Sequence, residues 1–251
     1  MLILSVDTSC SICRVGLFED DRLLGEIAED NKKSHSVKLM PMIEALLSEH
    51  LKKVSDVDMF APVNGPGSYT GLRIGVTTCK LLGYSTLKPV VPVNTLDQLA
   101  YSCDNVKDKT IICSCIDARN SRVFYSIYSA RVSEDCDNGK VELERLCEYD
   151  ADEINVVSEK VKCFMGEQGA LSVCFTGDGF IANKDFLKEQ FSEAMLTVSD
   201  EKISGSSEAI CKLALKKFNS QEDKGIFDSK NTEVFYLRMP HITLKKDKTE
   251  A

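Results

Sequence analysis

A glycine-rich turn, followed by a helix with small residues along one edge, constrains this fold more than any other stretch. Residues 64–84 read NGPGSYTGLRIGVTTCKLLGY. Glycine accepts positive φ and proline fixes its own φ, so Gly65–Gly67 predict a sharp change of direction. Ser68 or Thr70 can then cap a helix that runs to about Leu82.

Small residues recur along this helix at four-residue steps, so they lie on one ridge: Gly71, Gly75, Cys79 and Gly83. An interior glycine lowers helix stability by roughly 1 kcal/mol relative to alanine, so a close contact must compensate. Two partners for the ridge stay open, the chain's own sheet or a second protein. The helix start could also bind an anion, although the stretch matches neither a Walker A loop nor a GxGxxG fingerprint.

Composition limits the classes of function. The chain has 251 residues, 43% of them apolar and 28% charged, which is typical of a soluble globular protein of one or two domains. The net charge of −8 argues against binding RNA without a partner that supplies a basic face. No apolar run is long enough to span a membrane and the N-terminus lacks a basic leader, so we predict a cytoplasmic protein. Its eleven cysteines are expected to be reduced thiols.

An internal echo suggests two halves built on one plan. The strand ending at Asp7 is followed by a polar loop and a strand beginning Arg14-Val15. About 110 residues later, a strand ending at Asp117 is followed by a polar loop and a strand beginning Arg122-Val123. Periodicity further predicts these segments: strands over 1–7, 12–18, 23–27, 56–63, 90–93, 110–116, 122–128 and 172–175, and helices over 34–53, 68–82, 151–159, 185–195 and 205–218.

Several motifs together resemble one known family. They are the opening VDTS, His35-Ser36 followed by LMP, the block GPGSYTGLRIGV, the IDAR segment, the TGDG turn and the late YLR. This set is similar to the bacterial threonylcarbamoyladenosine biosynthesis protein family TsaB, also called YeaZ. The similarity covers nearly the whole chain, and residues 65–76 are its most diagnostic part.

The resemblance implies an α/β fold of two duplicated actin/Hsp70/sugar-kinase-like (ASKHA) domains, each a mixed sheet flanked by helices. We place them at 1–103 and 104–251, with the helix near 205–218 free to pack back on the first domain. In that family a larger homologous subunit, TsaD, works with TsaB and TsaE on tRNA. The catalytic subunit holds a metal through two histidines spaced i, i+4 on a helix, and the matching positions here are His35 and Leu39.

The resemblance therefore implies a catalytically silent scaffold that binds and activates TsaD, with no metal and no cofactor of its own. TsaE and tRNA would be reached through the complex, with no membrane contact, and the chain alone could form a homodimer. Weak ATP or ADP binding at a partner interface remains open. The partner interface is predicted at helix residues of the first domain, namely His35, Leu39, Ile43, Gly71, Leu72, Gly75, Val76 and Cys79.

Two enzyme classes stand as alternatives. A phosphotransferase of the same superfold would use two polar loops to hold a nucleotide, with Asp7, Thr8 and Ser9 in one and Gly177, Asp178 and Gly179 in the other. A peptidase would need a His/Glu metal pair or a Cys/His pair, and spacing reveals neither. The scaffold hypothesis is the one we carry forward.

Overall fold

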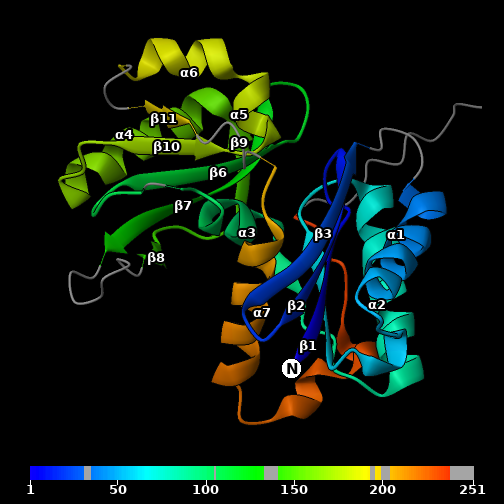
Figure 1. Ribbon diagram of the computed structural model, residues 1–251. Helices are drawn as coiled ribbons and strands as arrows, with labels where there is room; N and C mark the ends of the chain where they lie inside the picture. The colour runs from blue at the N-terminus through cyan, green and yellow to red at the C-terminus, as the bar shows by residue number, and fades with distance from the viewer. Residues whose placement is uncertain (31–34, 105, 133–140, 193–195, 199–203, 238–251) are drawn as a thin grey trace, which may run out of the picture.

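The computed structural model describes residues 1–30, 35–104, 106–132, 141–192, 196–198 and 204–237. Two sheets organise this part of the chain (Figure 1). The first contains strands β1 (Leu2–Asp7), β2 (Ile12–Glu19), β3 (Arg22–Asp30), β4 (Met59–Gly65) and β5 (Val93–Asn94). The second contains β6 (Ile111–Asp117), β7 (Arg122–Val132), β8 (Val141–Arg145), β9 (Asp150–Glu153), β10 (Val173–Thr176) and β11 (Leu196–Val198).

Helices cover or connect these sheets. They are α1 (His35–Glu49), α2 (Tyr69–Thr86), α3 (Thr95–Tyr101), α4 (Ile154–Gln168), α5 (Asp178–Ala182), α6 (Lys184–Gln190) and α7 (Ser207–Ser220). Three short 3-10 helices lie at Val54–Asp56, Lys224–Phe227 and Ser229–Asn231. The predicted helix over 151–159 is wrong at its start, because residues 150–153 pair with β7 as strand β9.

The two sheets share one topology. The first has the order β3-β2-β1-β4-β5, and the second has β8-β7-β6-β10 followed by β11. In the first sheet β1 pairs antiparallel with β2 and parallel with β4, and in the second sheet β6 pairs antiparallel with β7 and parallel with β10. Asp7 and Asp117 end the corresponding first strands. The sequence pattern that repeats around Asp7 and Asp117 therefore corresponds to a repeated strand arrangement.

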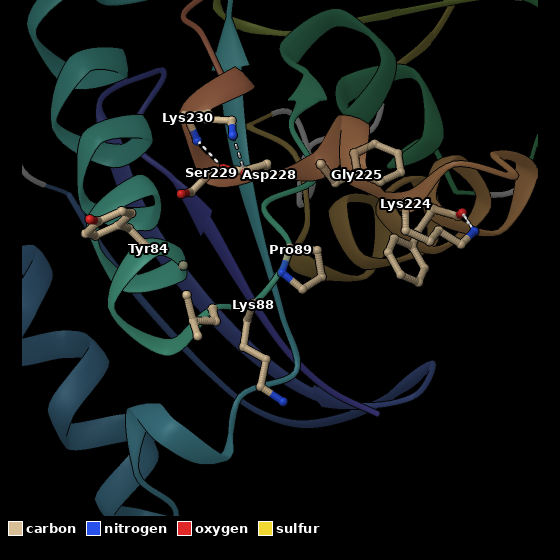
Figure 2. A pocket seen from close by; sticks show the side chains of 12 residues that line it. Tyr84, Lys88, Pro89, Lys224, Gly225, Asp228, Ser229 and Lys230 are labelled. Atoms are coloured by element: carbon tan, nitrogen blue, oxygen red, sulfur yellow. Dashed lines mark hydrogen bonds and ion pairs between the residues drawn. The ribbon is translucent and has the colours of Figure 1, made fainter.

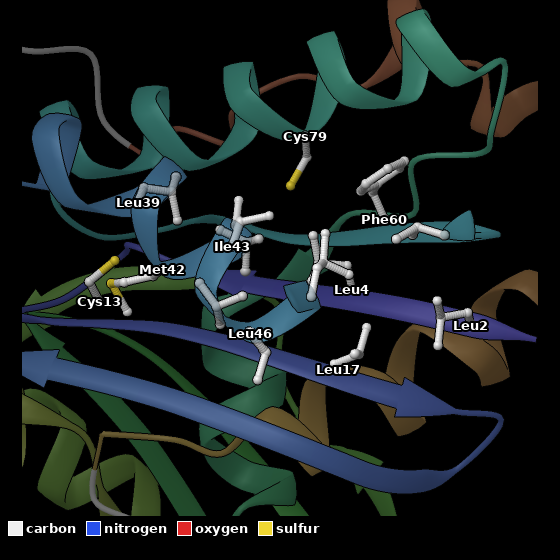
Figure 3. Close-up of a cluster of buried hydrophobic side chains, with 14 of the residues drawn as sticks. Leu2, Leu4, Cys13, Leu17, Leu39, Met42, Ile43, Leu46, Phe60 and Cys79 are labelled. Atoms are coloured by element: carbon white, nitrogen blue, oxygen red, sulfur yellow. The ribbon is translucent and has the colours of Figure 1, made fainter. Parts of the chain in front are cut away.

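Helices lie on both faces of the first sheet. Helices α1 and α2 cover one face and α7 the other (Figure 1). Successive side chains of β1 alternate between these layers, since Leu4 joins the cluster under α1 and α2 while Ile3 joins the cluster under α7. Figure 3 shows Cys79 of α2 and Ile43 of α1 pointing into the first of these clusters. A sheet buried on both faces explains why four of the five residues in LILSV are apolar and all five are buried.

The second sheet is covered in the same way. Helices α4, α5 and α6 contribute Val157, Phe180 and Leu187 to the core on one face. The other face packs against Ala100 of helix α3 through Ile112 of β6. Helix α3 thus lies between the two sheets, while α7 returns from the second half of the chain to the first sheet. The predicted boundary between residues 103 and 104 stays a prediction.

Candidate functional site

The glycine turn brings strand β4 against the loop that follows β1. Ser68 is the N-cap of α2, and its Oγ accepts a hydrogen bond from the backbone N–H of Gly71 at 3.3 Å. The N–H of Ser68 itself donates to the carbonyl oxygen of Ser9 at 2.7 Å. A side chain at Gly67 would meet that carbonyl, with Cβ 2.4 Å from the oxygen. The turn is therefore packed closely against the chain's own loop.

The small-residue ridge of α2 faces the same loop. A Cβ added at Gly71 would lie 2.0 Å from the backbone oxygen of Thr8, and one at Gly75 would lie 2.3 Å from Thr8 Oγ1. Thr8 Oγ1 also donates a 2.7 Å hydrogen bond to the carbonyl of Gly71. At the far end of the ridge, Gly83 meets Val90. The ridge thus serves close packing within this chain.

The predicted partner interface is consequently wrong in most of its residues. Five of the predicted interface residues are 0–2% exposed: Leu39, Ile43, Leu72, Val76 and Cys79. Leu39, Ile43 and Cys79 belong to the core between the helices and the first sheet. Gly71 and Gly75 are buried as well. His35 begins helix α1, and its side chain lies outside the described structure.

The surface that α2 leaves open lies on its opposite side. Residues two positions out of phase with the ridge are rotated by about 200° around the helix axis. They form an outward stripe of Tyr69, Arg73, Thr77 and Leu81, continued by Tyr84, and we call these five residues the α2 stripe. Leu81 and Tyr84 are 63% and 73% exposed. On the adjacent helix α1, Val37 is also 73% exposed.

The candidate nucleotide-binding residues after β1 form hydrogen bonds within the chain. Asp7 Oδ1 accepts hydrogen bonds from the backbone N–H and the hydroxyl of Ser9, at 2.8 and 2.6 Å. Asp7 Oδ2 accepts from Gln98 Nε2 at 3.2 Å. Asp7, Thr8 and Ser9 are at most 2% exposed. Sequence reasoning missed Gln98, whose partner is 91 positions away and leaves no local signal.

The second candidate loop lies near the first. Burial raises the pKa of the Cys10 thiol well above its usual value, and the negative charges of Asp178 and Asp7 raise it further. Cys10 therefore lies within electrostatic reach of both loops. Asp178 Oδ1 accepts from the backbone N–H of Asp117 at 2.9 Å. Gly177 and Gly179 pack on the backbone of Cys115, which leaves no space for a Cβ at either position.

The end of the described chain joins the glycine turn. Phe235 N–H donates to the carbonyl of Asn64 at 2.8 Å. Arg73 Nε donates to the Tyr236 hydroxyl at 2.9 Å, and the rings of Tyr69 and Tyr236 are 5.3 Å apart. Two motifs that carry the family resemblance, GPGSYTGLRIGV and YLR, are thus in contact through Tyr236. Arg238, the last residue of YLR, lies outside the described residues.

No metal centre is apparent in the described part of the chain, where His, Cys, Asp and Glu side chains do not gather in groups of three. Leu39, four residues after His35, points into the first-sheet core instead (Figure 3). Among the same described residues, the helices are too short or too polar to cross a bilayer.

A hollow of about 440 Å³ lies at the C-terminal end of α2 (Figure 2). Gly83, Tyr84 and Leu87 line one side, and the two last 3-10 helices line the other. Its lysines already have partners in the chain. Lys230 forms a 3.1 Å ion pair with Asp228, and Lys224 lies 4.4 Å from the Phe218 ring while donating to nearby carbonyls.

The repeated strand order, with helices on both faces of the first sheet, defines a protein of the actin/Hsp70/sugar-kinase fold class. A model of the family TsaD, tRNA N6-adenosine threonylcarbamoyltransferase, matches residues 22–225. The chain belongs to this family.

Its relatives confirm the resemblance to TsaB. The tRNA threonylcarbamoyladenosine biosynthesis protein TsaB of Bacillus subtilis is 35% identical over 128 residues, which cover 51% of this chain and 55% of that protein. TsaB of Escherichia coli is 30% identical over 128 residues, with the same coverage. The chain thus spans about half the length of the curated relatives it matches.

A solved structure shows the same fold over more of the chain. It is that of an uncharacterized Pseudomonas aeruginosa protein with similarity to peptidase YEAZ. It superposes with a TM-score of 0.73 at 23% identity, and covers 94% of this chain and 99% of its own. At this identity the likeness concerns the fold alone.

Proposed function

We propose that this chain is a non-catalytic subunit in the biosynthesis of threonylcarbamoyladenosine in tRNA, where it binds and activates a TsaD subunit. Family membership and the similarity to TsaB proteins support the pathway. The observation that supports a non-catalytic role is the presence of Leu39 in place of a histidine. Leu39 occupies the position of the second metal-binding histidine implied by the resemblance, and its side chain is 1% exposed within the core.

The α2 stripe, together with Val37 of α1, is the surface we assign to TsaD. The residues of the α2 stripe are exposed on the side of α2 that faces away from the first sheet, although Tyr69 and Arg73 also contact Tyr236 near the end of the described chain. Large exposed apolar side chains gathered on one layer are typical of protein interfaces. This assignment replaces the buried anchors predicted from the sequence and keeps the same two helices.

The test is a charge placed on the stripe. We expect Leu81→Asp to weaken TsaD binding at least tenfold, because an unpaired carboxylate buried in an apolar contact costs more than about 1.4 kcal/mol. The matched control is Leu171→Asp, which changes an 84% exposed leucine before β10. Binding is measured by calorimetry and thermal melts check that both variants fold.

Transfer activity provides the second readout. The wild-type chain is expected to transfer no threonylcarbamoyl group to tRNA by itself and to stimulate TsaD, while Leu81→Asp stimulates it less. Transfer by the isolated chain would disprove the silent role. Unchanged TsaD affinity for Leu81→Asp would place the interface elsewhere.

The remaining partners stay predictions of this proposal. TsaE and tRNA would join through the complex in the cytoplasm, and the same stripe could pair two copies of the chain when TsaD is absent. For the phosphotransferase alternative, the internal hydrogen bonds of Asp7 and Thr8 leave these side chains committed to the fold. Calorimetry with ATP and magnesium tests nucleotide binding by the chain alone and at the TsaD interface.

A further inference from the structure

A second cleft is lined by residues of α3, β7, β8 and α7. Figure 1 shows α3 and α7 between the first sheet and strands β7 and β8 of the second. Its volume is about 590 Å³, within the range of roughly 300–1,000 Å³ typical of small-molecule sites. Both halves of the chain contribute walls, so the cleft exists only in the assembled fold. It contains none of the residues assigned above to TsaD binding.

One wall of this cleft is cationic. Lys216 and Lys217 lie on the face of α7 that lines it, and Arg145 faces it from the end of β8. Lys217 Nζ donates to the neutral carbonyl of Pro92 at 2.8 Å. Among the described residues, no carboxylate lies within ion-pair distance of either lysine. Removal of water around the ammonium group lowers the pKa of Lys217, and the negative charge of Asp97 opposes that shift.

The carboxylate among the residues that line the cleft, Asp97, accepts hydrogen bonds from two tyrosines. Asp97 accepts hydrogen bonds from the Tyr128 hydroxyl at 2.8 Å and from the Tyr149 hydroxyl at 2.7 Å. Arg145 also approaches Glu148, but at 3.4 Å and with the glutamate side chain 87% exposed. Three cationic side chains and one carboxylate line the cleft, so this lining has a net positive charge although the whole chain carries a net charge of −8. Such a local field favours an anionic ligand.

Flat groups lie beside these cations. The Arg145 guanidinium lies 4.3 Å from the centre of the Tyr149 ring, and Phe235 meets that ring edge-on at 5.7 Å. Tyrosine rings and guanidinium planes are surfaces on which nucleic-acid bases stack. The hollow in Figure 2 lacks this combination, because its lysines are held by their own neighbours.

We propose that this cleft binds a nucleoside phosphate, with the phosphate at Lys216, Lys217 and Arg145 and the planar base against the Arg145–Tyr149 pair. The phosphate supplies the charge that the lysines lack, and the base matches the aromatic wall. Binding needs neither TsaD nor a catalytic metal, so it is independent of the function proposed above.

The experiment is calorimetric titration of the full chain at low salt with adenosine 5′-monophosphate, adenosine and inorganic phosphate as probes. We expect the monophosphate to bind more tightly than either of the other two. The double substitution Lys216→Gln/Lys217→Gln should weaken it at least about tenfold. The matched control is Lys184→Gln/Lys188→Gln on α6, which removes the same charge from exposed positions outside the cleft and should leave binding unchanged.

Three results would overturn the proposal. These are no heat from the monophosphate, equal affinity for adenosine and its monophosphate, or unchanged affinity after Lys216→Gln/Lys217→Gln. A final arm titrates a 17-nucleotide RNA stem-loop. If only the RNA binds, and the double substitution abolishes that binding, the free nucleotide is ruled out in favour of an RNA strand. Each result is read without TsaD, so it leaves the scaffold proposal to its own test.

Discussion

Thr8 holds strand β1 against helix α2 through contacts that leave no room for a side chain on the helix. Its Oγ1 donates to the Gly71 carbonyl, and the same oxygen would be 2.3 Å from a Cβ at Gly75. The glycines thus lower helix propensity but allow the strand and helix to approach closely. Protein interiors are packed so tightly that one additional methyl group lowers the stability of the fold.

At Gly75, substitution by alanine is expected to destabilise the fold by about 1–3 kcal/mol, since the contact with Thr8 outweighs the gain in helix propensity. At Gly166, near the end of α4, an added Cβ meets nothing within 4 Å. Gly166→Ala should therefore stabilise by about 0.5–1 kcal/mol. Urea denaturation of both variants measures the difference, and equal effects would show that the ridge is not tightly packed.

Among the elements, α7 has the most far-reaching role. It comes after all strands of the second sheet, yet Ile210 and Ala214 pack with Ile3 and Phe18 on the first sheet. Ser206 caps it through a hydrogen bond to the N–H of Ala209. An amphipathic helix gains most of its stability from such packing and little from propensity.

Truncation at the centre of this contact tests the role of α7. Ile210 is fully buried, so Ile210→Ala is expected to cost about 2–5 kcal/mol. Leu171→Ala, at a position 84% exposed, should change stability by less than about 0.5 kcal/mol. Denaturant unfolding followed by circular dichroism provides the comparison. A loss below 1 kcal/mol for Ile210→Ala would mean that α7 packs loosely.

On the scale of the whole molecule, the two halves have the same strand order, but the core of the first half depends on a helix from the second. The first sheet needs α7 to cover one face, and α7 comes from the end of the chain. The predicted first domain, residues 1–103, would therefore expose the apolar face that includes Ile3, Met59 and Val91. A large exposed apolar face favours aggregation over independent folding.

Expression of residues 1–103 alone tests this dependence. We expect an aggregated or poorly structured fragment, because the face normally covered by α7 has no substitute. The full chain is the control and should remain monodisperse at the same concentration, apart from any specific dimer. Size-exclusion chromatography and near-ultraviolet circular dichroism report the outcome. A soluble fragment with native-like signals would show that the first sheet folds without α7.

The sequence by itself determined what depends on near neighbours. Apolar runs predicted the main strands, Ser68 was correctly predicted as a candidate N-cap, and the echo between Asp7 and Asp117 predicted the duplicated plan. Strands β8 and β9 were missed, because VELER and DADE are too polar to show a strand pattern. The motifs also carry the resemblance to the TsaB family, because each lies within a short stretch of sequence.

Only the tertiary structure decided which surfaces meet. A ridge of small residues permits close approach to any neighbour, so the sequence could not tell Thr8 of the same chain from a second protein. The pairs Asp7 with Gln98, Arg73 with Tyr236 and Tyr128 with Asp97 join segments 31 to 163 positions apart. Such contacts depend on the path of the whole chain, whereas local propensity acts over only a few residues. For the same reason, the cationic cleft beneath α7 appears in the fold and not in any motif.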